Sequence, residues 1–305
     1  MDLSIIIISY NTKDITIACL ESLFGNYQEE FKKGKFEVIV VDNNSSDGSV
    51  EEIQNYSSTL RLRSRQELKI IKNERNFGFS KANNIGIKSS RGRYMLFLNS
   101  DTVVYPNTLT AMLDFMEANE KAGAATCSVI MPNNKIDDAC HRGFPTPWNS
   151  FTHFSGLAKV FSRSMIFNGY NLAWANLDKP HEIDACCGAF MMVRRTGGEE
   201  VGWWDEDFFW YGEDLDFCFR LKEKKWKIFY VPQVSILHYK GVSGGIKKIS
   251  KNLVVVDKET KKQAQRARFD AMRIFYKKHY EKNYPVPLNW LIYRGIFLGQ
   301  KIASI

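Results

Sequence analysis

The fold class is decided by one stretch of the chain, Arg93-Tyr94-Met95-Leu96-Phe97-Leu98-Asn99-Ser100-Asp101. Its apolar run predicts a strand that is covered on both faces, and the polar residues follow at once. Such strands are typical of parallel sheets, whose ligands bind beyond the carboxyl ends of the strands. Asp101 is therefore predicted to face a ligand at the edge of a sheet.

Outward from this stretch, strand-length apolar runs alternate with helical patterns through the first 131 residues. Besides 93–98, strands are predicted at 3–9, 36–41, 68–72 and 124–131. This alternation predicts an α/β fold of Rossmann-like type, with a mixed, mainly parallel sheet and helices on both faces. Four polar residues are predicted to converge where strands end: Asn11, Asp42, Asn76 and Asp101.

The second half of the chain is less regular. Residues 132–180 show no clear period, and strands return at 183–194 and, as a pair, at 228–238. Between them a loop becomes a helix at Gly212-Glu213-Asp214. A carboxylate at this position can act as a general base, although the helix dipole alone also favours an acid there. Asp216, on the same helix, is expected to be solvated or to cap the helix.

Aromatic residues precede that helix. Trp203, Trp204, Trp210 and Tyr211 offer ring faces on which a sugar ring can stack, and ordinary core packing is the alternative.

Composition and charge exclude several classes of protein. The chain has 305 residues, 44% hydrophobic and 25% charged, as in soluble globular proteins. Its formal net charge of +8 comes from residues 240–305, which hold 15 Lys and Arg against 4 Asp and Glu. The acidic balance of residues 1–239 argues against nucleic acid as a partner. The six cysteines have no zinc-type spacing and suit a reducing cytoplasm.

Several short motifs occur in a fixed order between Leu3 and about His238. They are Ser9-Tyr10-Asn11, Val40-Val41-Asp42-Asn43-Asn44-Ser45-Ser46-Asp47-Gly48-Ser49, Asn76-Phe77-Gly78-Phe79, Leu98-Asn99-Ser100-Asp101, Gly188-Ala189-Phe190 and Glu213-Asp214. Together they resemble family 2 inverting glycosyltransferases, in particular the rhamnosyltransferase-like branch that builds bacterial surface polysaccharides. The resemblance implies a nucleotide-sugar-binding domain of the GT-A type.

The resemblance also implies roles on the donor side. Asp42 would accept a hydrogen bond from the base or ribose, and Asp101 and His238 would hold a divalent metal, Mg²⁺ or Mn²⁺. Asn99 departs from the family, which often has Asp there, because an amide adds no charge. The implied nucleotide-sugar site comprises Ser9, Tyr10, Asn11, Asp42, Asn76, Gly78, Asn99 and Asp101.

On the catalytic side, Asp214 matches the family's general base, and Glu213 would orient it or bind the acceptor. A glycine-rich loop after His238 would bring Lys240 and Ser243 to the diphosphate. The predicted activity is transfer of a sugar from dTDP-rhamnose or a UDP-sugar to a hydroxyl of a glycan or lipid-linked acceptor.

Residues 1–239 are predicted to form the GT-A domain, with a nucleotide-binding half at about 1–131 and an acceptor and catalytic half at about 132–239. Residues 240–305 would form a basic flexible loop and a helical extension. One face of its last helix is apolar, which suits a helix lying on the inner, cytoplasmic face of the cell membrane. Packing on its own domain or in a homodimer is the alternative. The apolar face comprises Leu288, Leu291, Leu298, Ile302 and Ile305.

Two rival functions remain. A sugar-phosphate nucleotidyltransferase would need a glycine-rich phosphate loop after the first strand, and Ser9-Tyr10-Asn11-Thr12 contains no glycine. A non-catalytic carbohydrate-binding relative would be expected to lose Asp101 or Asp214, and both are present.

Overall fold

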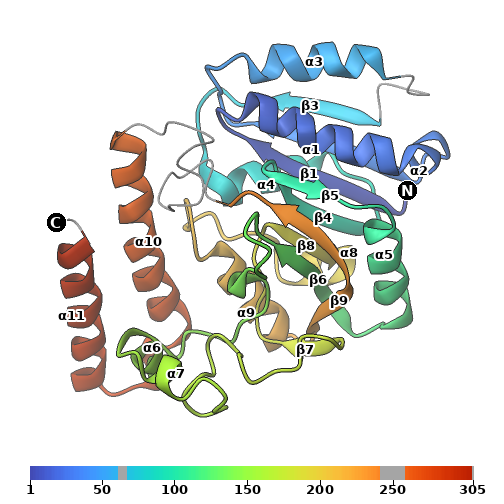
Figure 1. Cartoon of the computed structure of the whole chain (residues 1–305). Helices are drawn as coiled ribbons and strands as arrows, with labels where there is room; N and C mark the ends of the chain where they lie inside the picture. Colours follow the sequence, from blue (N-terminus) through green and yellow to red (C-terminus); the bar gives the residue numbers. More distant parts are fainter. Residues whose placement is uncertain (61–66, 241–257, 304–305) are drawn as a thin grey trace.

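The computed structural model of the chain describes residues 1–60, 67–240 and 258–303 (Figure 1). Ser243 and Ile305, both named above, lie outside these ranges.

The core is a nine-stranded sheet with the order β3-β2-β1-β4-β8-β6-β9-β5, and β7 pairs with β9. The first four strands are parallel, and β8 joins them antiparallel to β4. The strands are β1 (Leu3–Ser9), β2 (Phe36–Asp42), β3 (Leu68–Lys72), β4 (Tyr94–Asn99), β5 (Thr102–Val104), β6 (Ala122–Ile130), β7 (His181–Ile183), β8 (Phe190–Arg194) and β9 (Lys227–His238).

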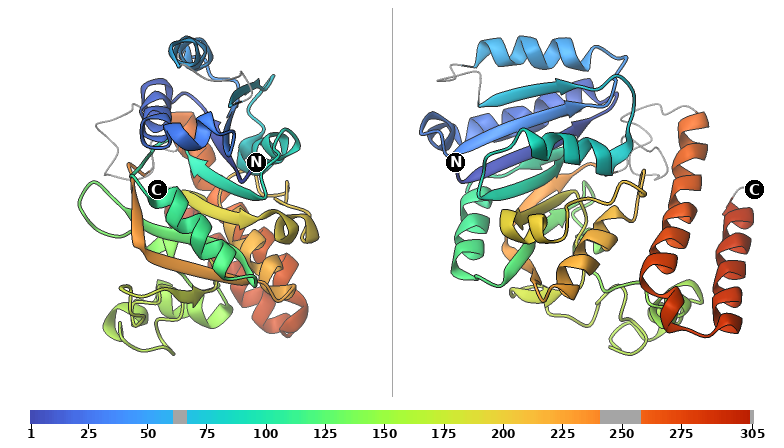
Figure 2. Two further views of the ribbon diagram at one scale, coloured as in Figure 1. Left: turned by 90° about the vertical axis from the view of Figure 1, so that its right-hand side faces the viewer. Right: turned by 180° about the vertical axis from the view of Figure 1, so that it is seen from behind.

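Helices cover both faces of the sheet, as predicted, with α1 and α4 on opposite sides (Figure 2). The helices are α1 (Lys13–Asn26), α2 (Gln28–Lys32), α3 (Ser49–Thr59), α4 (Gly78–Lys88), α5 (Thr108–Ala118), α6 (Pro147–Phe154), α7 (Leu157–Val160), α8 (Arg195–Glu200), α9 (Glu213–Glu223), α10 (Lys258–His279) and α11 (Val286–Ala303). Short 3₁₀ turns lie at Asp138–Cys140 and Glu281–Asn283.

The strand β1 lies at the centre of the hydrophobic core. Ile5, Ile6 and Ile7 are completely buried, because helices cover the sheet on both sides. Gly86 allows α4 to pack closely on β1 and β2: a Cβ there would lie 2.8 Å from Ile6 Cγ2 and 3.2 Å from Val41 Cγ2. The alternating apolar runs therefore form the predicted parallel sheet.

Two predicted strand boundaries are wrong. Residues 183–194 form two strands, β7 and β8, with an irregular connection between them. Residues 228–238 belong to one strand, β9, not a pair. In β9 the pairing with β6 skips from Val231 to Ser235, because Pro232 has no N–H to donate to the ladder and the strand bulges there.

The predicted helical C-terminal extension is confirmed as an antiparallel pair, α10 and α11, beside the sheet domain (Figures 1 and 2). The end of α10 belongs to the core, since Phe275 and Tyr280, the residue directly after the helix, are buried and their rings contact Phe219 of α9. Among the described residues, no helix combines the length and apolarity needed to cross a bilayer.

Candidate active site

The carboxyl ends of the parallel strands bring the predicted donor-side residues to one edge. Ser9 of β1 lies beside Asp42 of β2, and Ile8 lies beside Asn99 of β4. Asn11 follows β1 with a positive φ of 52° and accepts a hydrogen bond from Ser46 N–H at 2.8 Å through its Oδ1. The structure therefore shows the convergence of polar residues at this edge that the strand pattern predicts.

Asp42 is completely buried, and its two carboxylate oxygens differ. Oδ2 accepts a hydrogen bond from Ser45 N–H at 2.9 Å, whereas Oδ1 has no hydrogen-bond partner within the described part of the chain. A buried oxygen without a partner is costly, and a donor group of a bound ligand relieves that cost.

Asn76 and Gly78 connect the donor-side edge of the sheet to the loop that precedes Glu213. Asn76 Oδ1 accepts hydrogen bonds from Asn43 Nδ2 at 3.1 Å and from Gly78 N–H at 2.9 Å. Gly78 has a φ of +78°, and a Cβ on it would lie 2.4 Å from the carbonyl oxygen of Phe209. Phe79 N–H donates to that same oxygen at 2.9 Å. Gly78 is thus needed for the close approach of the loop that precedes Glu213.

His238 lies between two carboxylates. Its Nε2 is 3.1 Å from Asp101 Oδ1, and its Nδ1 is 3.8 Å from Asp137 Oδ2. Burial lowers the pKa of His238, but the two neighbouring carboxylates outweigh it and raise that pKa to about 9. Lys240 forms an ion pair with Asp137, and its charge together with His238 holds the pKa of Asp137 well below its usual range despite burial.

The Asp101–His238 pair fits a divalent cation. Two ligands bound side by side at about 2.1 Å from an octahedral cation lie about 3 Å apart, close to the separation seen here. A carboxylate facing the second ring nitrogen, as Asp137 does, is the usual partner of a metal-bound histidine. No cluster of three or more acidic, His or Cys side chains with metal geometry occurs among the described residues.

Helix α9 begins at Glu213, directly after two residues with positive φ, Tyr211 at 72° and Gly212 at 83°. Positive φ in a non-glycine residue such as Tyr211 stores strain and is concentrated at functional sites. Asp214 Oδ2 accepts a hydrogen bond from Arg142 at 2.5 Å, with the two side chains only 12% and 14% exposed. Its Oδ1 accepts one from Leu215 N–H at 2.8 Å. The helix start and Arg142 therefore fix the orientation of this carboxylate.

Glu213 differs from its neighbour. It is largely buried, and its Oε2 has no hydrogen-bond partner in the described structure. Burial, followed by the charge of Asp214, raises the pKa of Glu213 to about 8. Two adjacent carboxyl groups with different surroundings are typical of sites that divide acid and base roles between them.

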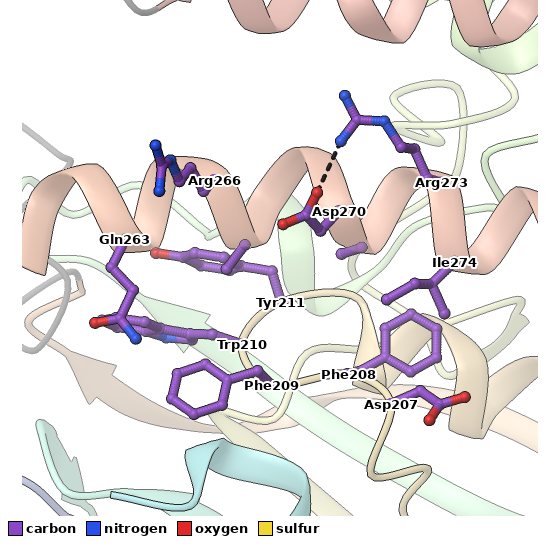
Figure 3. A pocket seen from close by; sticks show the side chains of 12 residues that line it. Asp207, Phe208, Phe209, Trp210, Tyr211, Gln263, Arg266, Asp270, Arg273 and Ile274 are labelled. Carbon is purple, nitrogen blue, oxygen red and sulfur yellow. Dashed lines mark hydrogen bonds and ion pairs between the residues drawn. The ribbon is translucent and has the colours of Figure 1, made fainter.

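A cavity of about 600 Å³ lies between the loop before α9 and one side of α10 (Figure 3). Trp210 and Tyr211 face Gln263 and Arg266 of α10, and an ion pair joins Asp270 to Arg273 at 2.7 Å. The Trp210 and Tyr211 rings are parallel, with centroids 5.6 Å apart. Flat rings combined with planar polar groups are suited to carbohydrate.

Two predictions about this region are wrong. Trp204, predicted to bind sugar, is 2% exposed and packs against Phe97 and Phe217 in the core, with ring centroids 4.7 and 4.9 Å away. Asp216 is completely buried rather than solvated, because Arg220 and His279 bind its two oxygens. Trp203 is half-buried beside Trp204, stacked on Phe217, and does not line the cavity.

Comparison with known proteins identifies the family. The profile of Glycosyl transferase family 2 matches residues 4–202. The chain belongs to glycosyl transferase family 2.

Its curated relatives include rhamnosyltransferases. Rhamnosyltransferase WbbL of Escherichia coli K12 is 26% identical over 170 residues, which cover 53% of this chain and 61% of the relative. The N-acetylglucosaminyl-diphospho-decaprenol L-rhamnosyltransferase of Mycobacterium tuberculosis is 25% identical over 222 residues, 68% of each chain. This chain thus spans less than two thirds of the length of WbbL. The likeness to the rhamnosyltransferase branch is confirmed.

Solved structures confirm the GT-A fold. Staphylococcus aureus TarS residues 1–349, in complex with UDP-GlcNAc, superposes with a TM-score of 0.56 at 17% identity, covering 97% of this chain and 72% of TarS. The mannosyltransferase PcManGT of Pyrobaculum calidifontis, in complex with GDP-Man and Mn²⁺, gives 0.54 at 15% identity, covering 97% and 79%.

Proposed function

We propose that this chain is an inverting glycosyltransferase that moves a sugar from a nucleoside-diphosphate sugar to a hydroxyl of a glycan or lipid-linked acceptor in cell-surface polysaccharide biosynthesis. The observation that carries this proposal is the buried Glu213–Asp214 pair, which starts α9 directly after a loop that lines a cavity and contacts the donor-side edge through Gly78. The rhamnosyltransferase relatives support dTDP-rhamnose as donor, and a UDP-sugar is the alternative.

The donor would lie along the carboxyl edge of β1, β2 and β4. Asp42, with its unpartnered buried oxygen, would accept a hydrogen bond from the base or ribose. The other proposed contacts at this edge are Ser9, Tyr10, Asn11, Asn76, Gly78 and Asn99.

Asp101 and His238 would hold Mg²⁺ or Mn²⁺ beside the diphosphate. Bound there, the cation would neutralise charge on the leaving nucleoside diphosphate. Mn²⁺ in the PcManGT structure supports a divalent metal in this fold. Lys240 and Ser243 would add positive charge and a hydroxyl near the same phosphates.

Asp214 would act as the general base. The acceptor oxygen forms a bond to the anomeric carbon, its proton passes to Asp214, and the bond from that carbon to the phosphate oxygen breaks, which inverts the configuration. Each carboxylate oxygen has a second lone pair, so the contacts to Arg142 and Leu215 leave room for the acceptor hydroxyl. Arg142 is the positioning residue, and Glu213 would contact the acceptor.

The acceptor would enter the cavity beside α10, where Trp210 and Tyr211 provide ring faces and Gln263 and Asp270 provide polar groups. The protein would work at the inner, cytoplasmic surface of the cell membrane, held by the apolar face of α11 and by nearby basic residues. The alternative is that the apolar face of α11 forms the interface of a homodimer.

A panel of nucleotide sugars, measured by thermal shift and donor hydrolysis with and without Mg²⁺ or Mn²⁺, tests the proposal. We expect one dTDP- or UDP-sugar to raise the melting temperature in the presence of metal and to be hydrolysed slowly. Binding without any hydrolysis or transfer would favour a non-catalytic carbohydrate-binding relative. No shift with any nucleotide sugar would refute the proposal.

A further inference from the structure

Residues 147–167, which form α6, α7 and the turn that follows, expose many large apolar side chains; we call this the α6–α7 surface. Soluble monomers rarely expose such patches unless they bind a protein or a membrane. Its exposed members are Trp148 (47%), Phe151 (56%), Phe154 (66%), Val160 (74%), Phe161 (48%), Met165 (65%) and Ile166 (67%). This surface plays no part in the chemistry proposed above.

The α6–α7 surface is held in place by specific contacts. Trp148 Nε1 donates a hydrogen bond to the carbonyl of Ile166 at 2.8 Å, which ties α6 to the turn after α7. The Phe167 ring lies 5.9 Å from that of Trp148 and 4.9 Å from that of Phe161. Buried Asn168 donates to the carbonyl of Ser162 at 2.8 Å. The apolar side chains are therefore presented to solvent by an ordered scaffold.

The charge of the segment is one-sided. The sequence contains no Asp or Glu between residues 139 and 177. Lys159 and Arg163 are exposed, and neither has a carboxylate partner in the described part of the structure. Aromatic and aliphatic side chains flanked by lysine and arginine, without acids, match the surface of an anionic bilayer.

Helix α11 has the same chemistry and lies nearby. The sequence has no Asp or Glu from residue 282 to its end. In Figures 1 and 2, α6 and α7 lie at the same end of the molecule as the turn between α10 and α11. The exposed apolar residues of α11 include Trp290, Leu291, Phe297, Leu298 and Ile302.

We propose that the α6–α7 surface binds the surface of an anionic lipid bilayer, with Phe154, Val160 and Ile166 entering the interface between headgroups and acyl chains. A second copy of this chain is a poorer occupant, because two cationic surfaces repel each other. The proposal goes beyond the transfer reaction and does not depend on it. It also adds a second contact to the one proposed for α11.

Vesicle co-sedimentation of the full chain tests the apolar part. The probe is phosphatidylcholine vesicles with about one third phosphatidylglycerol, compared with phosphatidylcholine alone. We expect the triple variant Phe154→Ser, Val160→Ser, Ile166→Ser to bind the anionic vesicles roughly tenfold or more weakly. All three positions are exposed, so the melting temperature should not fall. The matched control is Tyr105→Ser, an exposed aromatic residue between β5 and α5.

A second variant pair tests the charge. Lys159→Gln and Arg163→Gln should each weaken binding to anionic vesicles about fivefold and leave the weak binding to neutral vesicles unchanged. The proposal would be overturned if the triple variant bound anionic vesicles as tightly as the wild type does. It would also be overturned if sedimentation equilibrium showed a dimer for the wild type and a monomer for the triple variant, while the triple variant still bound vesicles. The α6–α7 surface would then be a dimer interface. Donor hydrolysis measured on the same samples reports the proposed enzyme activity separately, because it needs no vesicle.

Discussion

At the scale of single residues, the assignment of the base rests on how Asp214 is held. Arg142 and the first turn of α9 orient its carboxylate. Asp214→Asn keeps the shape of the side chain but removes proton acceptance, and its Nδ2 can no longer accept from Arg142 or from Leu215 N–H. We expect kcat to fall by a factor on the order of 10²–10⁴, with little change in the affinity for the donor. Steady-state kinetics with donor titration measure both, and Asp114→Asn in α5 is the matched control. Transfer by Asp214→Asn at the wild-type rate would show that another group is the base.

The neighbouring Glu213 predicts a pH dependence of stability. Burial and Asp214 raise its pKa to about 8 in the folded protein, against 4.5 ordinarily. Between these two values the folded state keeps a proton that the unfolded state releases, so the wild type loses stability as pH rises through this window. Glu213→Gln removes the loss, which amounts to at most about 1.4 kcal/mol for each pH unit.

Urea unfolding at pH 5, 7 and 9 measures this effect. The difference between Glu213→Gln and the wild type should grow with pH in favour of the variant. Glu223→Gln, an exposed acid at the other end of α9, should show no such trend. A difference that stays constant with pH would mean that Glu213 is ionised in the folded protein.

The proposed metal pair makes a third prediction at this scale. Asp101→Ala and His238→Ala should each remove most of the metal dependence of donor binding, because each deletes one of two protein ligands. EDTA should have the same effect on the wild type. Isothermal titration with the nucleotide sugar measures it, and His181→Ala in β7 is the control. Full donor binding and transfer in chelator would leave Lys240 and the glycine-rich sequence after it to stabilise the leaving group.

At the scale of elements, the contact between Gly78 and the Phe209 loop couples the donor-side edge to the start of α9. Gly78→Ala places a Cβ 2.4 Å from the Phe209 carbonyl, so that loop must move. We expect loss of stability and a larger loss of transfer. Gly34→Ala has a similar positive φ, +66°, but no atom within 4 Å of the new Cβ. It should cost only about 1 kcal/mol of stability and keep transfer. Equal effects of the two changes on transfer would show that the contact does not serve the site.

The sequence predicts elements well where their signals are local. The apolar runs of β1, β2 and β4 lie in single windows of the chain, and so do the polar residues that follow them. Asp137 and Arg142 were missed because they belong to the irregular segment 132–180, and their partners His238 and Asp214 are 101 and 72 residues away. Trp204 was misassigned because a tryptophan in the core and one in a sugar site have the same local sequence pattern.

At the scale of the whole molecule, α10 and α11 differ in what they contribute. α10 places Phe275 and Tyr276 in the core, and its His279 binds the buried Asp216 at 2.8 Å. α11, described over Val286–Ala303, has no buried residue of its own and rests on α10 through contacts such as that between the Tyr276 and Tyr293 rings, 5.6 Å apart. The predicted boundary at residue 239 therefore stays a prediction, and truncation after residue 285 separates the two contributions more cleanly than truncation after 239.

Removal of residues 286–305 tests the proposed anchor. The truncated chain should bind anionic vesicles roughly thirtyfold or more weakly, because it loses the apolar face of α11 and two cations worth about 1 kcal/mol each near an anionic surface. The binding that remains should come from the α6–α7 surface and weaken further with salt, since charges are screened over ~8 Å at physiological ionic strength. Transfer to a soluble acceptor should persist, while transfer to a lipid-linked acceptor should fall. A sharp drop in melting temperature with unchanged vesicle binding would instead assign α11 to the core or to a dimer interface.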